Sequence, residues 1–214
     1  MRVGILGSGE VGQALAKAFK NEGHEVMLAT REPQHKKALE LKRDIGVEIG
    51  DFATVAKYCE LAVLATLWTA TESAIELIEP KNLIGKTIID VTNPLDFTTG
   101  MPPQLLLGTT DSAGEQVQRW LPKSKVVKAL NTVGNAHMYK PEFGDITPTM
   151  FYCGNDSGAK EITHTILLSF GWQPVDIGDI TSARELEPMC VLWVKYGMAT
   201  SQWNHVLTMI QKPS

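Results

Sequence analysis

Three glycines near the start of the chain have the spacing of a diphosphate-binding turn. Gly7, Gly9 and Gly12 form the pattern G-x-G-x-x-G directly after the apolar pair Ile5 and Leu6. The first glycine of such a motif permits a tight turn, the second lets the backbone approach a pyrophosphate, and the third lets a helix pack closely on a strand. The N–H groups at the start of that helix then face the phosphates. A strand before the motif and a helix after it favour a dinucleotide site over a purely structural turn.

The residues after the second expected strand indicate which dinucleotide is bound. An NAD site usually has Asp or Glu at this point, which accepts a hydrogen bond from the ribose 2′-OH. This chain has Thr30 and Arg31 instead, and an arginine attracts a 2′-phosphate and can stack on adenine. Lys36 adds positive charge nearby, and Glu32 is expected to point away. The pattern predicts a preference for NADP(H); the alternative is that Arg31 is an ordinary solvated residue.

Strand and helix patterns alternate along the chain. We expect strands at residues 1–6, 24–29, 46–49, 61–66, 87–91, 126–128, 149–153 and 172–175. We expect helices at residues 10–21, 34–43, 52–58 with Asp51 as the cap, 71–78, from 111 or 112 to about 121, 157–170, and from 182 onward. This alternation predicts an α/β fold of the Rossmann type, a doubly wound parallel sheet with helices on both faces.

The change of pattern after residue 134 predicts two regions. Residues 1–134 are expected to form the NADP-binding Rossmann domain, and residues 135–214 a small C-terminal α/β region packed on it. Residues 92–114 form a long segment rich in Pro, Gly and Thr. A loop of that length inside a compact domain is typical of a functional rim.

The last helix carries two further expectations. Ser182 and Glu185 have the spacing of a capping box at its start. Asp176 and Arg184 are expected to form an ion pair within the C-terminal region. The helix also has more apolar surface than a small region can cover, which predicts a homodimer formed through Val191, Leu192, Val194 and Met198.

Composition excludes several classes of protein. The chain has 214 residues and a net charge of −4, so no broad basic surface for nucleic acid is expected. The apolar runs fall short of the ~20 residues that a membrane helix needs, and the N-terminus lacks the apolar core of a signal peptide. The three cysteines have no zinc spacing, and we expect no metal site. Buried free thiols are typical of the reducing cytoplasm, which we take as the expected location.

These residues together resemble those of the coenzyme F420-dependent NADP oxidoreductases, which are NADPH-dependent reductases of a deazaflavin. The resemblance runs essentially end to end. It rests on the glycine motif, Thr30-Arg31, and the segments LAVL at 61–64, VKALNT at 127–132 and CGND at 153–156. Residues 174–178 and 182–187 are also similar to the cytosolic reductase domain of six-transmembrane metalloreductases. Because the chain stops at Ser214 without a membrane part, we expect a free-standing relative of that branch.

The resemblance implies positions for the cofactor. The phosphates are expected at the glycine turn, the adenosine end at the second strand, and the nicotinamide end after the later strands. The implied residues are Gly7, Ser8, Gly9, Glu10, Val11, Gly12, Thr30, Arg31, Lys36, Ala65, Thr66, Leu67, Trp68, Asn93, Pro94, Asn131, Thr132 and Val133. Asn131 and Thr132 are candidate hydrogen-bond donors to an acceptor ring. Trp68 is equally consistent with a role in packing the hydrophobic core.

The second substrate is less defined than NADP(H). Deazaflavin reductases often carry His where this chain has Asn131, and their loop after the fifth strand differs from residues 93–108. The acceptor is therefore expected to be a small molecule with a flavin-like ring, either coenzyme F420 or FMN/FAD. Hydride transfer between two such rings needs stacking at about 3–3.5 Å and the exclusion of water, but no general acid or base in principle. The sequence accordingly shows no convincing acid–base dyad.

Two other functions are consistent with the glycine motif. The first is a small-substrate NADP-dependent dehydrogenase or imine reductase, which usually adds a long helical domain with a catalytic lysine. Lys195 lies on the final helix, but Met198 occupies the position where a partner Asn is expected. The second is a non-catalytic NADPH-binding sensor, which needs the dinucleotide site but no acceptor site.

Overall fold

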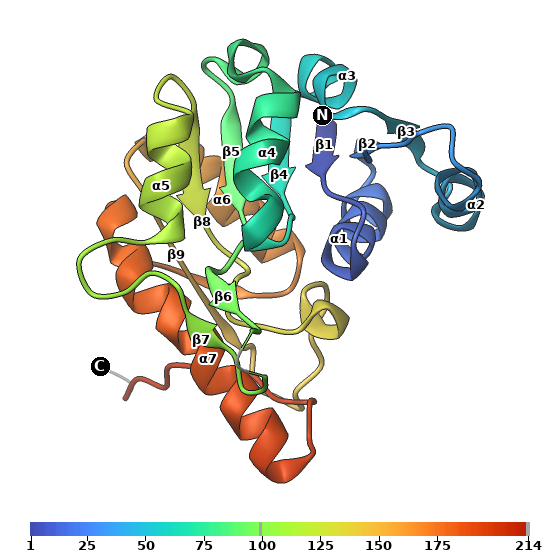
Figure 1. Cartoon of the computed structure of the whole chain (residues 1–214). Helices are drawn as coiled ribbons and strands as arrows, with labels where there is room; N and C mark the ends of the chain where they lie inside the picture. Colours follow the sequence, from blue (N-terminus) through green and yellow to red (C-terminus); the bar gives the residue numbers. More distant parts are fainter. Residues whose placement is uncertain (99, 213–214) are drawn as a thin grey trace.

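A computed structural model describes residues 1–98 and 100–212 of the chain. Its centre is an eight-stranded sheet in which every neighbouring pair of strands is parallel except β8 and β9. The order across the sheet is β10 (Gln173–Asp176), β9 (Thr149–Gly154), β8 (Lys125–Lys128), β5 (Thr87–Asp90), β4 (Leu61–Leu64), β1 (Arg2–Leu6), β2 (Glu25–Ala29) and β3 (Glu48–Gly50). The predicted doubly wound Rossmann-type fold is confirmed (Figure 1).

Helices cover both faces of the sheet. They are α1 (Glu10–Asn21), α2 (Lys36–Ile45), α3 (Phe52–Tyr58), α4 (Trp68–Ile78), α5 (Ala113–Trp120), α6 (Ser157–Ser169) and α7 (Ala183–Thr200), with short 3-10 turns at Pro80–Leu83, Asn135–His137 and Ile180–Ser182. One core forms where α1 and α6 pack on the sheet, and a second forms where α3, α4 and α5 pack on the opposite face. The inner strands β4 and β5 are therefore buried along their whole length, as parallel strands between two helical layers must be.

The expected elements appear within two residues of their predicted bounds, except at the start of α4. Helix α2 begins after His35, whose ring accepts a hydrogen bond from the N–H of Lys37. Helix α4 begins at Trp68, three residues earlier than predicted. There the Thr71 hydroxyl bonds both the Leu67 carbonyl and the Thr66 hydroxyl and so supports the first turn. Side-chain contacts of this kind can set the start of a helix independently of its apolar pattern.

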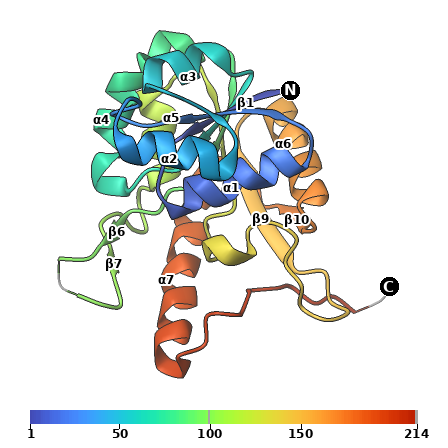
Figure 2. The same ribbon diagram turned by 90° about the vertical axis from the view of Figure 1, so that its right-hand side faces the viewer.

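The capping box predicted for α7 is wrong. The Ser182 hydroxyl donates to the carbonyl of Ile177 at 2.9 Å and makes no capping bond to the helix. Helix α7 is held by long-range contacts instead, described below. Its C-terminal half extends past the edge of the sheet, and residues 201–212 run back from its end (Figure 2). That return is fixed where the Thr149 backbone N–H donates to the Thr208 hydroxyl at 3.2 Å.

The long segment after β5 contains a small hairpin. Strands β6 (Leu95–Asp96) and β7 (Gln104–Leu105) pair in antiparallel orientation beside α7 (Figure 1). The strands after residue 134, β9 and β10, join the same sheet as β8, so the division of the chain into two regions at that point stays a prediction. Across the described part of the chain, none of the helices has the length and apolar character needed to cross a bilayer.

Candidate dinucleotide site

A cavity of about 950 Å³ opens at the carboxyl ends of β1, β4 and β5. Strand β1 lies between β4 and β2, and the chain connections reverse direction there. Doubly wound sheets bind ligands at this switch point because the loops on either side diverge. The described residues that line the cavity include 7–11, Arg31, 65–68, Thr92, Asn93 and 95–98.

The glycine turn forms the floor of the cavity, and each glycine has a separate steric reason. Gly7 has a φ of +128°, and a Cβ at this position would overlap the carbonyl oxygen of Ala65. A Cβ on Gly12 would overlap the carbonyl oxygen of Gly7. A Cβ on Gly9 would meet nothing within 4 Å. Gly7 and Gly12 are thus required by the protein's own packing, whereas Gly9 leaves open space for a ligand.

The start of α1 is suited to an anion. Its N-cap is Gly9, which has no side chain to accept a bond from the first-turn N–H groups. The Gln13 side chain donates to the carbonyl of Ser8 at 2.9 Å and fixes the approach to the helix. Uncapped N–H groups at the positive end of a helix dipole attract phosphate. The residues present therefore fit the diphosphate of a dinucleotide.

Arg31 follows β2 at one end of the cavity. Its side chain is exposed, and among the ion pairs of the described residues none involves it. The cation is thus available to an anionic ligand. The structure does not bring Thr30 or Lys36 to the cavity lining. The Thr30 N–H donates to Gly50, and Lys36 lies on exposed α2 beside Glu40 at 3.7 Å.

The opposite end of the cavity is apolar at its rim. Leu67 and Phe97 both line it, with 74% and 52% of their surface exposed. Trp68 lines the cavity and also stacks on Trp120, with ring centroids 5.5 Å apart. Trp68 therefore both packs against a neighbouring ring and faces the cavity, and its contact with a cofactor stays a prediction. Large exposed apolar side chains around a cavity mark a binding surface for an apolar or aromatic ligand.

Asn131 supports the cavity wall from behind. It is buried, and its side-chain amide donates to Asn93 Oδ1 at 2.9 Å and to the Leu186 carbonyl at 3.1 Å. Asn93 in turn donates to the Asn131 carbonyl at 2.8 Å. Both amide protons of Asn131 are thus engaged within the protein. This geometry argues against Asn131 as a donor to an acceptor ring and makes it the residue that orients Asn93.

The neighbours of Asn131 also point away from the cavity. Thr132 is buried and lies with its hydroxyl 3.9 Å from the sulfur of Met150. Val133 belongs to the hydrophobic core, and Pro94 is buried outside the lining. Of the residues expected at the nicotinamide end, the structure brings Ala65, Thr66, Leu67, Trp68 and Asn93 together.

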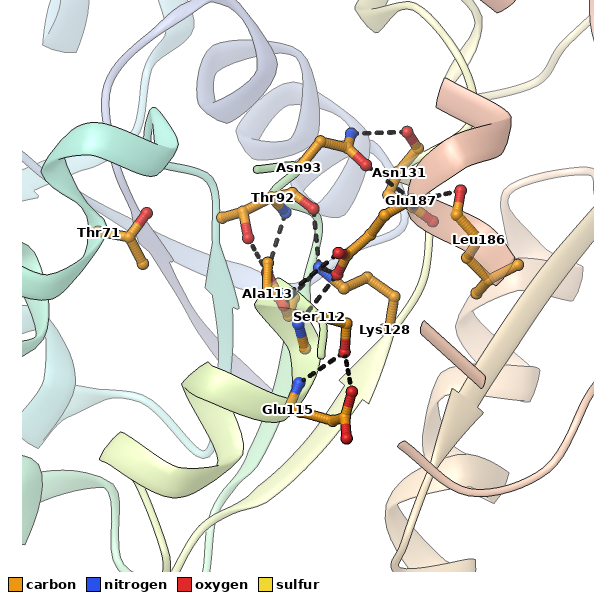
Figure 3. Close-up of polar contacts among 12 residues, drawn as sticks. Thr71, Thr92, Asn93, Ser112, Ala113, Glu115, Lys128, Asn131, Leu186 and Glu187 are labelled. Atoms are coloured by element: carbon orange, nitrogen blue, oxygen red, sulfur yellow. Dashed lines mark hydrogen bonds and ion pairs between the residues drawn. The ribbon is translucent and has the colours of Figure 1, made fainter. Parts of the chain in front are cut away.

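A buried ion cluster contacts Thr92, which lines the cavity, and none of the sequence patterns predicted this cluster (Figure 3). The Lys128 ammonium is 2.7 Å from Asp90 Oδ2 and 3.2 Å from Glu187 Oε1. It also donates to the Thr92 carbonyl at 2.7 Å. The sequence feature that could have indicated the cluster is a charged residue at the end of an apolar strand. Asp90 ends TIID of β5, and Lys128 ends KVVK of β8.

Burial and charge act in opposite directions on this cluster. Burial alone would lower the pKa of Lys128, but the Asp90 and Glu187 carboxylates outweigh it and hold the pKa above its ordinary value. Burial raises the pKa of Glu187, and the Lys128 ammonium opposes that rise. Burial also raises the pKa of Cys153 and of Cys190 to about 12. These thiols are therefore poor nucleophiles at neutral pH.

A second ion pair joins α5 to α7. Arg184 binds both carboxylate oxygens of Glu115, at 2.8 and 2.6 Å. The bond from Arg184 holds the pKa of Glu115 below its ordinary value. The expected pair between Asp176 and Arg184 is wrong, because Asp176 pairs with Lys160 at 2.8 Å on α6. The arginine reaches a carboxylate on another helix that the sequence spacing cannot reveal.

The cysteines and the potential metal ligands are arranged as follows. The three cysteines, Cys59, Cys153 and Cys190, are free and buried, as predicted. Across residues 1–98 and 100–212, no group of three or more His, Cys, Asp or Glu side chains is placed to hold a metal ion.

Comparisons with known proteins agree with this geometry. Residues 2–94 match the family model described as NADP oxidoreductase, coenzyme F420-dependent. The F420-dependent NADP reductase of Methanocaldococcus jannaschii is 28% identical over 207 residues, which is 91% of each chain. A crystal structure from Arthrobacter sp. FB24, provisionally assigned as an F420-dependent NADP-reductase, is 37% identical. It has a TM-score of 0.93 and covers 99% of this chain and 100% of its own.

Two further similarities are narrower. Metalloreductase STEAP3 of Rattus norvegicus is 27% identical over 195 residues; the match covers 87% of this chain but only 36% of STEAP3. An imine reductase of Streptomyces aurantiacus is 16% identical with a TM-score of 0.69, and the match covers 94% of this chain and 64% of that one. At this identity the imine reductase shows a shared fold alone.

Proposed function

The chain belongs to the family of coenzyme F420-dependent NADP oxidoreductases, and we propose that it transfers a hydride between NADP(H) and a flavin-like acceptor ring. The chain is thus an NADPH-dependent reductase. The observation that carries the proposal is the single cavity that joins an uncapped helix start to an apolar rim. One end suits phosphates, and the other suits the faces of planar rings.

Different residues of the cavity bind different parts of NADP(H). The N–H groups at the start of α1 bind the diphosphate, with Gly9 giving the backbone access to it. Arg31 recognises the 2′-phosphate of NADP(H) and places the adenosine end at β2. The remaining length of the dinucleotide then runs toward Thr66 and Asn93. Asn131 keeps the Asn93 amide in one orientation at that end.

The apolar rim supports the acceptor. When bound, NADPH supplies a hydride, and its ring carries the redox chemistry. Leu67 and Phe97 provide flat apolar contact for a second ring and exclude water from the space between the rings. The Methanocaldococcus jannaschii relative is named for F420, whereas STEAP3 is named a metalloreductase. We propose coenzyme F420 or FMN/FAD as the acceptor, because the apolar rim suits a planar ring and the Methanocaldococcus jannaschii relative is named for F420.

Titration and turnover of the purified protein test this proposal. Calorimetry measures the dissociation constants of NADPH and NADH at the dinucleotide cavity, and we expect NADPH to bind more tightly. Addition of FMN, FAD or coenzyme F420 to the NADPH complex should then cause loss of the dihydronicotinamide absorbance with one of the three. Tight NADPH binding without oxidation by any ring acceptor would show that the chain is a sensor and not a reductase.

The position of Lys195 argues against the imine-reductase alternative. Lys195 lines a different cavity, of about 690 Å³, between α7 and the segment around β7. It does not line the dinucleotide cavity, where a catalytic lysine would have to reach the nicotinamide. Replacement of Lys195 by Met should therefore leave hydride transfer unchanged. A loss of turnover in that variant, with the NADPH affinity retained, would revive the alternative.

The outer face of α7 supports a homodimer. Leu192, Tyr196 and Met198 have 56%, 50% and 38% of their surface exposed on this helix. Val194 is 9% exposed and Val191 is half-buried, so the expected contribution of Val194 to the contact is wrong. Light scattering of the wild type and of a Leu192→Glu variant tests the contact, with a shift from dimer to monomer as the expected result. The cytoplasmic location stays a prediction.

A further inference from the structure

The ion cluster behind the cavity wall is removed from water. The side chains of Asp90 and Lys128 are 0% exposed, and that of Glu187 is 2% exposed. They come from three separate elements, namely β5, β8 and α7. Charges this deep act over longer distances than surface charges because water and salt do not screen them.

The hydrogen bonds and ion pairs of the cluster fit two carboxylates and one ammonium. Asp90 Oδ1 accepts from the N–H and the hydroxyl of Thr92, at 2.9 and 2.7 Å, while Oδ2 faces the Lys128 ammonium. The two oxygens of Glu187 accept from the N–H groups of Ala113 and Gly114, at 2.9 and 3.0 Å. Since every carboxyl oxygen faces a donor, both groups fit the carboxylate form. Two carboxylates and one ammonium give the cluster a net charge of −1.

Thr92 connects this charge to the cofactor site. It lines the dinucleotide cavity, its carbonyl accepts from Lys128, and its N–H and hydroxyl are both held by Asp90. It follows β5, on the opposite side of β1 from Arg31. With the 2′-phosphate at Arg31 and the diphosphate at α1, this is the end of the cavity that would receive the nicotinamide.

We infer that the buried negative charge of Asp90, Lys128 and Glu187 favours the oxidised form of the bound nicotinamide, and so makes bound NADPH a stronger hydride donor. The inference rests on the proposed function. Transfer of a hydride removes one proton and two electrons from a neutral ring and leaves a ring with one positive charge. The acceptor takes the hydride together with a proton from solvent. A fixed negative charge nearby stabilises the positive ring and leaves the neutral one almost unaffected.

The ratio of two dissociation constants measures this effect. Asp90→Asn and Glu187→Gln each remove the net charge while keeping the size of the side chain. For each variant and the wild type, calorimetry gives the Kd of NADP⁺ and the Kd of NADPH in the same buffer. We expect the ratio of the NADP⁺ value to the NADPH value to rise in both variants by roughly three- to tenfold, the effect of one charge at about 12–20 Å and a dielectric constant of about 20.

The ratio separates this role from a merely structural one. Partial unfolding of a variant weakens both ligands equally and leaves the ratio unchanged. Glu115→Gln is the control for a carboxylate charge that solvent screens, because its partner Arg184 is 31% exposed whereas the cluster side chains are at most 2% exposed. Its ratio should stay within about twofold of the wild type.

Three results would overturn the inference. They are a ratio unchanged in both cluster variants, a change in the opposite direction, and an equal change in Glu115→Gln. Failure of the proposed function has a different signature in the wild type, which would then either bind neither nucleotide or bind NADPH without reducing any ring acceptor. A wild type that binds both nucleotides and reduces a ring acceptor, with variants that keep its ratio, removes the inference and leaves the proposed function intact.

Discussion

The two walls of the dinucleotide cavity are built in contrasting ways. The glycine turn uses backbone from one short stretch of chain, and its shape depends on side chains that are missing at Gly7 and Gly12. The opposite wall depends on side chains that meet from distant parts of the chain. Glu187, for example, accepts from the N–H of Ala113, 74 residues away. The first wall is formed by residues close together in the sequence, and the second forms only once the sheet and α7 have assembled.

This difference predicts different responses to mutation. A change in the glycine turn acts through steric overlap and through access to the ligand. A change in the ion cluster acts through charges that have lost their partners in a dry environment. The variants below test the contrast, beginning with the largest expected effect.

Lys128→Met removes the cation between two buried carboxylates. The methionine fills a similar volume but leaves Asp90 and Glu187 without their shared partner, so we expect a loss of about 3–5 kcal/mol in the free energy of unfolding. Urea unfolding followed by circular dichroism measures it. Lys195→Met on the exposed side of α7 is the matched control and should change the stability by less than about 0.5 kcal/mol. Equal effects at the two positions would show that the cluster contributes no special stability.

Gly12→Ala tests the local wall. Its methyl group would overlap the Gly7 carbonyl, so strand and helix must move apart, at a cost of about 1–3 kcal/mol in folding free energy. Gly9→Ala is the matched control, since it meets nothing within 4 Å and has an ordinary backbone conformation. It should fold as stably as the wild type but bind NADPH more weakly. If Gly9→Ala kept full affinity, the diphosphate would not lie on this turn.

Arg31→Ala removes the cation at the adenosine end. We expect NADPH binding to weaken by ~1.5–3 kcal/mol, while NADH binding changes little, because a charge-assisted contact to the 2′-phosphate is lost. Calorimetry with both nucleotides measures the difference. Lys37→Ala, on exposed α2, serves as the control for a general loss of positive charge. A similar loss for NADPH and NADH would show that Arg31 does not read the 2′-phosphate.

Glu115→Gln should cause the smallest loss in the free energy of unfolding, about 1–2 kcal/mol, and this loss should depend on pH. Arg184 lowers the pKa of Glu115 in the folded protein below the ordinary value of 4.5. The stabilisation is therefore fully present above pH 4.5 and is lost as the pH falls through the lower folded-state pKa. Unfolding of wild type and variant at several pH values measures it, with Glu185→Gln as the exposed control. A stability difference that stays constant below pH 4.5 would contradict this role for the pair.

The sequence by itself determined the sheet, the glycine turn and the cation at Arg31. Strands buried between helices need uninterrupted apolar residues, and a tight turn beside a carbonyl needs Gly7, so both leave local signals that can be read along the chain. The helix starts at Lys36 and Trp68 were displaced from their predicted positions because side-chain bonds, not apolar periodicity, set them.

Only the tertiary structure decided the other half of the site. It bonded the side-chain amide of Asn131 to Asn93 and Leu186, paired Arg184 with Glu115 in place of Asp176, and joined Asp90, Lys128 and Glu187 into one cluster. These contacts form between elements far apart in the sequence, and no periodicity or spacing records which charged side chain will face which. Their strength comes from the exclusion of water, and water is excluded only when the packed core is complete.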